Sequence, residues 1–362
     1  MNKQQIINLA LAFILLAFIS AISFGAADDF VIENDVLIKY NGTEEEITIP
    51  DGVTKIGNRA FLDNEYDGNT SIISIVIPNS VISIESAAFL YSPNLTEINV
   101  NENNPNYASV DGVLFNKDKT ELIKYPARKP ETSYEIPNSV ISIGKSVFFG
   151  CTSLTSIVIP NNITSIGEGA FHECTSLTSI VIPDRVTSIE DYTFRYCIAL
   201  SYITIPDSVK SIGDDAFGAC TSLTSIVIPD SVISIGDYAF DGCSSLTSIT
   251  IPDSVTSIGE DAFCACTSLT SIVISNNVTS IGESTFSNCK SLISIVIPSS
   301  VINIEDSAFY NCISLTSIVI PDSVISIGDY AFDDCDNLTI YGKAGSTAEK
   351  YAKENDIKFQ EM

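Results

Sequence analysis

The sequence predicts a repeat solenoid, with a parallel β-sheet on one face and short helical or 3₁₀ turns on the other. Three observations support this fold class. A 23-residue period runs through most of the chain, the apolar spacing changes within each period, and 45% of the 362 residues are hydrophobic. Equal units of this length stack into one continuous core, in which each coil contacts only its neighbours.

Three residue types mark the period in consecutive units. A cysteine follows each phenylalanine three residues later, and a leucine follows each cysteine after another three. The phenylalanines are Phe148, Phe171, Phe194, Phe217, Phe240, Phe263, Phe286, Phe309 and Phe332. The unit reads I-P-D-S-V-x-S-I-G-D-x-A-F-x-x-C-x-S-L-T-S-I-V, and less regular copies precede it around Phe61 and Phe89. Stacking then predicts core ladders, which include Phe171, Phe240, Cys174, Cys243, Leu177 and Leu246.

Each unit changes its periodicity halfway. Segment 223–229 alternates, with isoleucines on one face and Ser225 and Val227 on the other, and it ends in a proline. This pattern predicts a short strand. In segment 237–243, Phe240 and Cys243 lie three residues apart, which suits a single helical or 3₁₀ turn. Each coil is therefore expected to run strand, loop, short turn, loop.

Stacking is what makes such coils stable. Ordering a residue costs ~1–2 kcal/mol for the backbone alone, whereas burying a large apolar side chain gains ~1.5–3 kcal/mol, so one unit cannot fold by itself. Stacked strands pair in parallel at about 4.8 Å and leave columns of serine and valine on their outer face. This uncharged face is our candidate binding surface, and it comprises Ser156, Val158, Ser179, Val181, Ser225, Val227, Ser248, Ser271, Val273 and Val296.

The repeat carries a specific family resemblance. L-x-x-I-x-I followed by P-D-S-V and S-I-G-x-x-A-F-x-x-C resembles the repeat of the BspA-like leucine-rich-repeat surface proteins, over roughly residues 35 to 360. The resemblance implies a curved leucine-rich-repeat superhelix on a cell surface, working in adhesion to host proteins or to other cells. Segment 106–126 resembles the insertion coil, and segment 340–352 the C-terminal cap, of such proteins. The shared motif is scaffold and identifies no binding residue.

The ends of the chain differ from the repeats. Residues 1–27 contain Lys3 as their one charged side chain and end in small residues, which predicts a secretory signal, with an uncleaved anchor as the alternative. We expect an N-terminal cap at 28–46, with a strand at 36–38. The repeats then occupy 47–338 as about 11 to 12 coils, with a longer insertion coil at 101–135. A C-terminal cap at 339–362 holds a short helix, which a capping box of Ser346 and Glu349 begins.

Charge restricts the partners. With 18 Lys and Arg against 45 Asp and Glu, the net charge is −27, which disfavours nucleic acid. No second long apolar run follows residue 27, so no membrane insertion of the mature body is expected. No cofactor motif is present either. The expected partner is an extracellular or cell-surface protein of a host or a neighbouring cell, and the expected location is secreted or at the cell surface.

Carboxylates recur in two columns. One runs through Glu168, Asp191, Asp214, Asp237, Glu260, Glu283, Asp306 and Asp329, and the other through Asp184, Asp207, Asp230 and Asp253. Divalent cations between the coils are one interpretation. The other, which we favour for the first column, is that each carboxylate caps the N-terminus of its short turn. No dedicated metal site is predicted.

The remaining reactive residues favour a non-enzymatic protein. Ladder cysteines on adjacent coils point the same way, so we expect free, buried thiols rather than disulfides. Cys264 occupies a variable slot, where it is more exposed and could pair with another chain. His172, the one histidine, occupies the same slot and has neither metal-ligand nor triad geometry around it. No catalytic residue is predicted.

Two functions remain open. The first is adhesion or protein recognition, and the alternative is a passive structural component of a cell envelope or extracellular matrix. Uniform repeats favour the alternative, because a specific site normally breaks the pattern. The irregular positions at which specificity is expected are the 101–135 insertion, Arg195, Tyr202 and Lys290.

Overall fold

The computed structural model describes residues 27–62 and 70–362. The expected signal segment lies outside these residues, apart from Ala27. The chain divides into two compact units, Met1–Val113 and Leu114–Met362. Among the described residues, none of the helices has the length and apolar character that crossing a bilayer requires.

The first unit begins with a hairpin and continues as parallel coils. A 3₁₀ turn η1 (Ala27–Asp29) leads into β1 (Phe30–Glu33), which pairs antiparallel with β2 (Val36–Tyr40), the strand expected at 36–38. Two sheets follow, in the orders β1-β2-β4-β6 and β3-β5-β7. Their other strands are β3 (Glu46–Thr48), β4 (Lys55–Ile56), β5 (Ser74–Ile77), β6 (Ser83–Ile84) and β7 (Glu97–Val100), and β8 (Tyr107–Val110) comes next. Phe61 stacks on Phe89 in the core, with ring centroids 5.5 Å apart.

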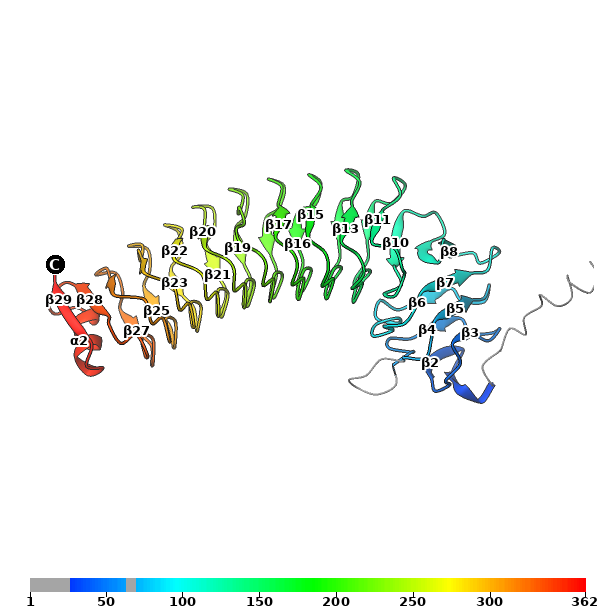
Figure 1. The fold of residues 1–362 in the computed structure, drawn as a ribbon, viewed down its shortest axis with the longest axis horizontal. Helices are drawn as coiled ribbons and strands as arrows, with labels where there is room; N and C mark the ends of the chain where they lie inside the picture. The colour runs from blue at the N-terminus through cyan, green and yellow to red at the C-terminus, as the bar shows by residue number, and fades with distance from the viewer. Residues whose placement is uncertain (1–26, 63–69) are drawn as a thin grey trace, which may run out of the picture. The chain divides into compact units, whose positions relative to one another are not determined.

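The second unit is a row of stacked coils, most of which have two short strands (Figure 1). It opens with an antiparallel pair in the insertion coil, β9 (Val113–Asn116) and β10 (Glu121–Lys124). The first strands of the coils are β11 (Ser133–Glu135), β13 (Ser156–Val158), β15 (Ser179–Val181), β17 (Tyr202–Thr204), β20 (Ser248–Thr250), β22 (Ser271–Val273), β24 (Ser294–Ile295) and β26 (Ser317–Val319). Equivalent residues 23 positions apart pair in parallel, for example Ser156 with Ser179.

The second strand of each coil was not expected from the sequence. It consists of the two residues before the glycine or glutamate that recurs once in each unit, and it pairs in parallel with its equivalents, as Ile189 does with Ile212. These strands are β12 (Ser142–Ile143), β14 (Ser165–Ile166), β16 (Ser188–Ile189), β18 (Ser211–Ile212), β19 (Ser234–Ile235), β21 (Ser257–Ile258), β23 (Ser280–Ile281), β25 (Asn303–Ile304) and β27 (Ser326–Ile327). Two residues are too few to show a period, so the alternation within them carried no signal.

The strand expected at 223–229 was a wrong prediction. The segment has no strand, although its burial alternates as expected, with Ile226 and Ile228 buried and Ser225 and Val227 exposed. Alternation reports which side chains face the core. A strand also needs a ladder of backbone hydrogen bonds to a neighbouring coil, about which alternation says nothing.

The turn opposite the first strand is hydrogen-bonded both within itself and to the next coil. Tyr238 and Gly242 have φ angles of 56° and 67°, in the left-handed region. Their amides donate to the carbonyls of Glu260 and Cys264 in the next coil, both at 2.8 Å. The amides of Asp241 and Cys243 instead donate within the turn, to the carbonyls of Tyr238 and Phe240 at 2.9 Å and 3.1 Å, which is the bonding of the expected 3₁₀ turn. Alternate amides therefore close the turn and connect the coils.

The core is a set of ladders along the stack. The Phe240 ring stacks between Phe217 and Phe263, with centroids 5.2 Å and 5.3 Å away and interplanar angles of 7° and 3°. Cys243 is buried beside them, and its thiol donates to the carbonyl of Phe217 in the preceding coil at 3.2 Å. The same thiol contact recurs along the ladder from Cys174 to Cys335. The ladder thiols therefore act as hydrogen-bond donors as well as small apolar groups.

All ten cysteines are free in this structure, which predicts the result of a thiol titration. Unfolded, non-reduced protein should react with about ten equivalents of a maleimide, because no bridge consumes a thiol. Native protein should react slowly, since nine thiols are buried and burial raises the pKa of inner ladder thiols such as Cys174 and Cys220 well above the ordinary thiol range. Fewer than about four reactive thiols after unfolding would establish disulfides.

The C-terminal segment covers the last coil. Strand β28 (Thr339–Gly342) precedes helix α2 (Thr347–Glu354), and β29 (Lys358–Glu361) pairs in parallel with β28. Ser346 caps the helix by accepting from the Glu349 amide, and the Glu349 carboxylate accepts from the Gly345 amide at 2.6 Å. Tyr351 packs edge-on against Phe332, with centroids 5.8 Å apart, and so closes the phenylalanine ladder.

Candidate functional site

The candidate binding surface, which we call the strand face, consists of the outward serines and valines of the first strands. All ten residues assigned to it from the sequence are exposed. Strand pairing brings Ser156, Val158, Ser179 and Val181 together, and likewise Ser248, Ser271 and Val273. Ser225 and Val227 lie between these two groups outside any strand, and Val296 bridges to Val319. The most exposed valines are Val227 at 80% and Val296 at 77%.

Threonine hydroxyls beside the strand face donate hydrogen bonds to backbone carbonyls of the preceding coil. Thr155 donates to the carbonyl of Thr132 at 3.0 Å, and Thr178 donates to that of Thr155 at 3.2 Å. The donors thus hold neighbouring coils together. What the face offers a partner is rigid methyl groups and serine hydroxyls, interrupted by the exposed phenol of Tyr202. A surface of this kind is desolvated at low cost.

A second exposed column lies beside the second strands and was missed from the sequence. Isoleucine occupies the variable residue of S-V-x-S in several coils, and these side chains project outward. In the second unit they are Ile141, Ile233, Ile302 and Ile325, and Ile82 occupies the same position of the repeat in the first unit. The signal was visible as an apolar residue at a position that elsewhere holds threonine or lysine. Its meaning depended on the second strand, which was not expected.

The variable slot around His172 and Arg195 forms an aromatic cluster. The His172 ring meets Phe149 edge-on at 5.0 Å and stacks near Tyr196 at 5.9 Å. The Arg195 guanidinium lies 4.8 Å from the Tyr196 centroid, and its Nε is 3.1 Å from Asp215 Oδ1. Burial, followed by the Arg195 charge, lowers the pKa of His172 to about 4. The imidazole is therefore neutral at pH 7 and packs as an aromatic ring.

The first acidic column connects the coils. Asp237 Oδ1 accepts from the Glu260 amide of the next coil at 2.8 Å. The same contact is made by Asp191, Asp214 and Asp306. The expectation that each carboxylate caps its own turn was therefore wrong at these positions, because the amide belongs to the following coil. Every acceptor is an aspartate, because its short side chain places Oδ1 within hydrogen-bond distance of the amide in the next coil.

The second acidic column is exposed along its length. Asp184, Asp207, Asp230 and Asp253 lie on the surface after the prolines, and Asp253 accepts from the amide and side chain of Asn276, both at 3.1 Å. Within the described residues, no group of three or more His, Cys, Asp and Glu side chains is arranged to hold a metal ion. The Asp253 contact supports an inter-coil role for this carboxylate.

Cys264 is half-buried, unlike the ladder thiols. It lies against Asp241 and Asp261, and burial together with these carboxylates raises its pKa to about 12. A thiol in this setting is a poor nucleophile. Pairing with another chain stays a prediction.

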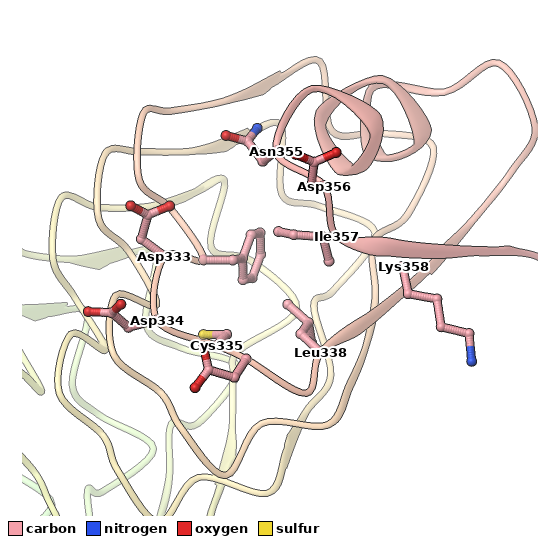
Figure 2. A pocket seen from close by; sticks show the side chains of 10 residues that line it. Asp333, Asp334, Cys335, Leu338, Asn355, Asp356, Ile357 and Lys358 are labelled. Carbon is pink, nitrogen blue, oxygen red and sulfur yellow. The ribbon is translucent and has the colours of Figure 1, made fainter.

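A cavity of about 380 Å³ opens where the last coil meets the C-terminal segment (Figure 2). Its lining includes Phe332, Cys335 and Leu338, which are buried, and Ile357, which is half-buried. Four aspartates also line it, namely Asp333, Asp334, Asp336 and Asp356. We call this cavity the end pocket. Sequence reasoning missed it because it arises where the repeat stops.

Comparison with known proteins identifies the scaffold. The family model for the BspA type leucine-rich repeat region, in six copies, matches residues 39–126, 127–226 and 210–339. A leucine-rich-repeat protein from Bacteroides ovatus ATCC 8483 is 26% identical, with a TM-score of 0.59, over 92% of this chain and 97% of that one. A leucine-rich cell surface protein from Faecalibacterium prausnitzii A2-165 is 30% identical, with a TM-score of 0.48, over 89% and 94%.

No curated protein matches the chain. The family model covers well over half of it, and the 23-residue register of the structure follows the matched repeats. The expected solenoid fold is confirmed, and so is the resemblance drawn from the repeat motif. The chain belongs to the BspA-type leucine-rich-repeat family.

Proposed function

We propose that this protein is a non-enzymatic recognition protein, secreted or displayed at the cell surface, which adheres to an extracellular or cell-surface protein through its strand face. The observation that carries the proposal is the exposure of an uncharged column of valines and serines in register on stacked coils. Exposed β-branched side chains on a rigid scaffold lose little entropy when a partner covers them.

Two further observations support a surface role. The chain belongs to a leucine-rich-repeat family, and a 30% identical relative is described as a cell surface protein. The predicted signal at 1–27 agrees with export. A catalytic role has little support, because His172 is neutral and packed among aromatic rings, and Cys264 has a raised pKa.

Replacing Val227, Val273 and Val296 by lysine should abolish adhesion. The three charges would have to be desolvated at the interface, and we expect binding to weaken at least about ten-fold. Thermal stability should change little, because the three side chains are exposed. Binding is measured by surface plasmon resonance against purified extracellular-matrix proteins and by adhesion to whole cells.

The matched control neutralises three acidic residues with Asp214→Asn, Asp237→Asn and Glu260→Gln. Asparagine retains the oxygen that accepts the inter-coil amide, so the fold should persist. This control should keep full affinity. If it loses binding while the lysine variant keeps it, recognition lies on the acidic edge. If the native protein binds neither the matrix proteins nor cells, the passive structural role is the better explanation.

A further inference from the structure

The aromatic cluster around Arg195 interrupts the repeat in a single coil. Among the coils of the second unit, the coil of Phe194 alone has two tyrosines at the three variable positions of the turn, with an arginine between them. Tyr192 and Tyr196 are both left-handed, with φ 58° at each, as are the equivalent residues Asp215 and Ala219 of the next coil. The backbone of the turn therefore follows the repeat, and the side chains are what differ.

The Arg195 side chain is held in one orientation. Its Cζ lies 4.8 Å from the Tyr196 ring centroid and 5.8 Å from that of Tyr192, within the range of cation–π attraction for both rings. Its Nε lies 3.1 Å from Asp215 Oδ1 in the next coil. The adjacent His172 ring is neutral at pH 7. Arg195 therefore supplies the positive charge of the aromatic cluster.

The two Nη atoms of Arg195 are available to a ligand. The ion pair with Asp215 is made by Nε, and within the described parts of the chain neither Nη atom donates a hydrogen bond. The Arg195 side chain is 34% exposed. The next coil has Gly218 at the same position of the repeat, so no side chain at that position covers the guanidinium. The structure thus presents an ordered, planar pair of donors at the surface.

Aromatic faces and carboxylates surround these donors. Tyr192 and Tyr196 are 37% and 40% exposed. The π face of a phenol ring is negative and attracts the C–H groups of a sugar ring. The Glu173 side chain is 43% exposed beside His172, and its carboxylate can accept from a hydroxyl group. A ligand with several negative charges would be repelled by Glu173 and Asp215, whereas a ligand with one carboxylate and several hydroxyls suits all of these groups.

We propose that the aromatic cluster binds a carboxylated sugar residue, a uronic or sialic acid, of a cell-surface or matrix glycan. The sugar carboxylate accepts from the two Nη atoms of Arg195 in a bidentate pair. The C–H face of the sugar packs on Tyr196, and a sugar hydroxyl donates to Glu173. A glutamate side chain of a peptide is the poorer ligand, because it has no hydroxyl for Glu173. The aromatic cluster lies on the turn, opposite the strand face, and binding there does not depend on adhesion through that face.

Saturation-transfer difference NMR on the full chain tests the proposal with three probes. 3′-Sialyllactose and a hyaluronan tetrasaccharide carry sialic and uronic carboxylates, respectively, and lactose carries none. The native protein should bind at least one of the two acidic probes with a Kd of about 1 mM or lower, and lactose at least ten-fold more weakly. Arg195→Lys should weaken binding of the acidic probe at least ten-fold, because an ammonium group cannot pair with both carboxylate oxygens in the same plane.

Two matched variants separate the aromatic cluster from its surroundings. Tyr196→Ala should weaken binding several-fold, whereas Tyr196→Phe keeps the ring face and should retain it. Arg185→Lys changes an exposed arginine of the same coil outside the aromatic cluster, and Tyr238→Ala changes an exposed tyrosine at the position equivalent to Tyr192. Both should leave affinity unchanged. Circular dichroism melts verify folding, and Tyr196→Ala decides the outcome if Arg195→Lys unfolds, because the Tyr196 side chain is largely outside the core.

Four results would overturn the proposal. One is the absence of binding to both acidic probes, and another is equal affinity for lactose, since the carboxylate would then play no part. Undiminished binding in Arg195→Lys, or an equal loss in Arg185→Lys, would mean that the Arg195 donor pair is not the site. Equally tight binding of the peptide acetyl-Gly-Glu-Gly-amide would make an acidic protein segment the ligand. The strand-face lysine variant should bind the sugars normally, so failure of adhesion and failure of sugar binding are distinguishable.

Discussion

Phe240→Ala is expected to lower the free energy of unfolding by about 3–5 kcal/mol. The ring is fully buried and stacked on both sides, so its removal leaves a cavity within the ladder. The cavity cannot easily collapse, because the Phe240 amide donates to the Ala262 carbonyl at 2.8 Å and fixes the spacing of the coils. Chemical denaturation followed by circular dichroism measures the loss.

Tyr238→Ala is the matched control, two residues away on the same turn. Its side chain is 44% exposed, and its backbone contact to Glu260 does not depend on the ring. We expect a loss within about 1 kcal/mol. Because coils are coupled to their nearest neighbours, hydrogen exchange should localise the effect of Phe240→Ala to the flanking coils. Equal losses in the two variants would show that the faces of the turn are reversed.

Much of the fold was predictable because a repeat turns one-dimensional spacing into three-dimensional position. Once residues 23 apart are stacked, the burial of Phe240, Cys243 and Leu246 follows, as does the exposure of Val227. The helix after Ser346 was predictable from local capping chemistry. These features depend on side-chain type and spacing, which the sequence displays directly.

What could not be predicted depends on backbone contacts between coils. The left-handed residues of the turns include Tyr238, Asp215 and Ala219. Unlike glycine, these residue types do not indicate a positive φ. Their conformation directs amides toward carbonyls of the next coil. These stabilising hydrogen bonds can be recognised only once the coils are stacked. The thiol bond of Cys243 to a carbonyl and the aspartate contacts of the acidic column arise in the same way.

The candidate sites divide along the same line. The strand face follows from the period, whereas the end pocket lies where the period ends and the last coil lacks a successor. The exposed isoleucines beside the second strands are an intermediate case. The isoleucines could be identified in the sequence, but the strand beside which they lie could not be predicted. Position relative to the repeat, rather than residue type, thus decided what sequence reasoning could find.

Gly236→Ala is expected to cost about 1–3 kcal/mol, through crowding rather than through backbone conformation. The glycine column does not require a left-handed backbone, in agreement with Glu190 and Glu305 at the same position. A methyl group on Gly236 would instead lie 2.7 Å from the Asp214 backbone nitrogen and 2.7 Å from the Gly213 carbonyl carbon. These are backbone atoms of the preceding coil, so one coil must move.

That movement would strain the contacts that set the coil spacing, namely the Gly236 amide to the Ile212 carbonyl and the Asp237 amide to Asp214 Oδ1, each at 2.9 Å. Gly282→Ala is the matched control. There a methyl would meet Thr285 Oγ1 at 3.2 Å and the Gly259 carbonyl at 3.5 Å, which a small side-chain rotation relieves. Alanine also restricts the unfolded chain, so Gly282→Ala should lie within about 1 kcal/mol of the native protein. Denaturation curves of the two variants decide the matter, because equal costs would mean that close approach between coils is not why glycine occupies position 236.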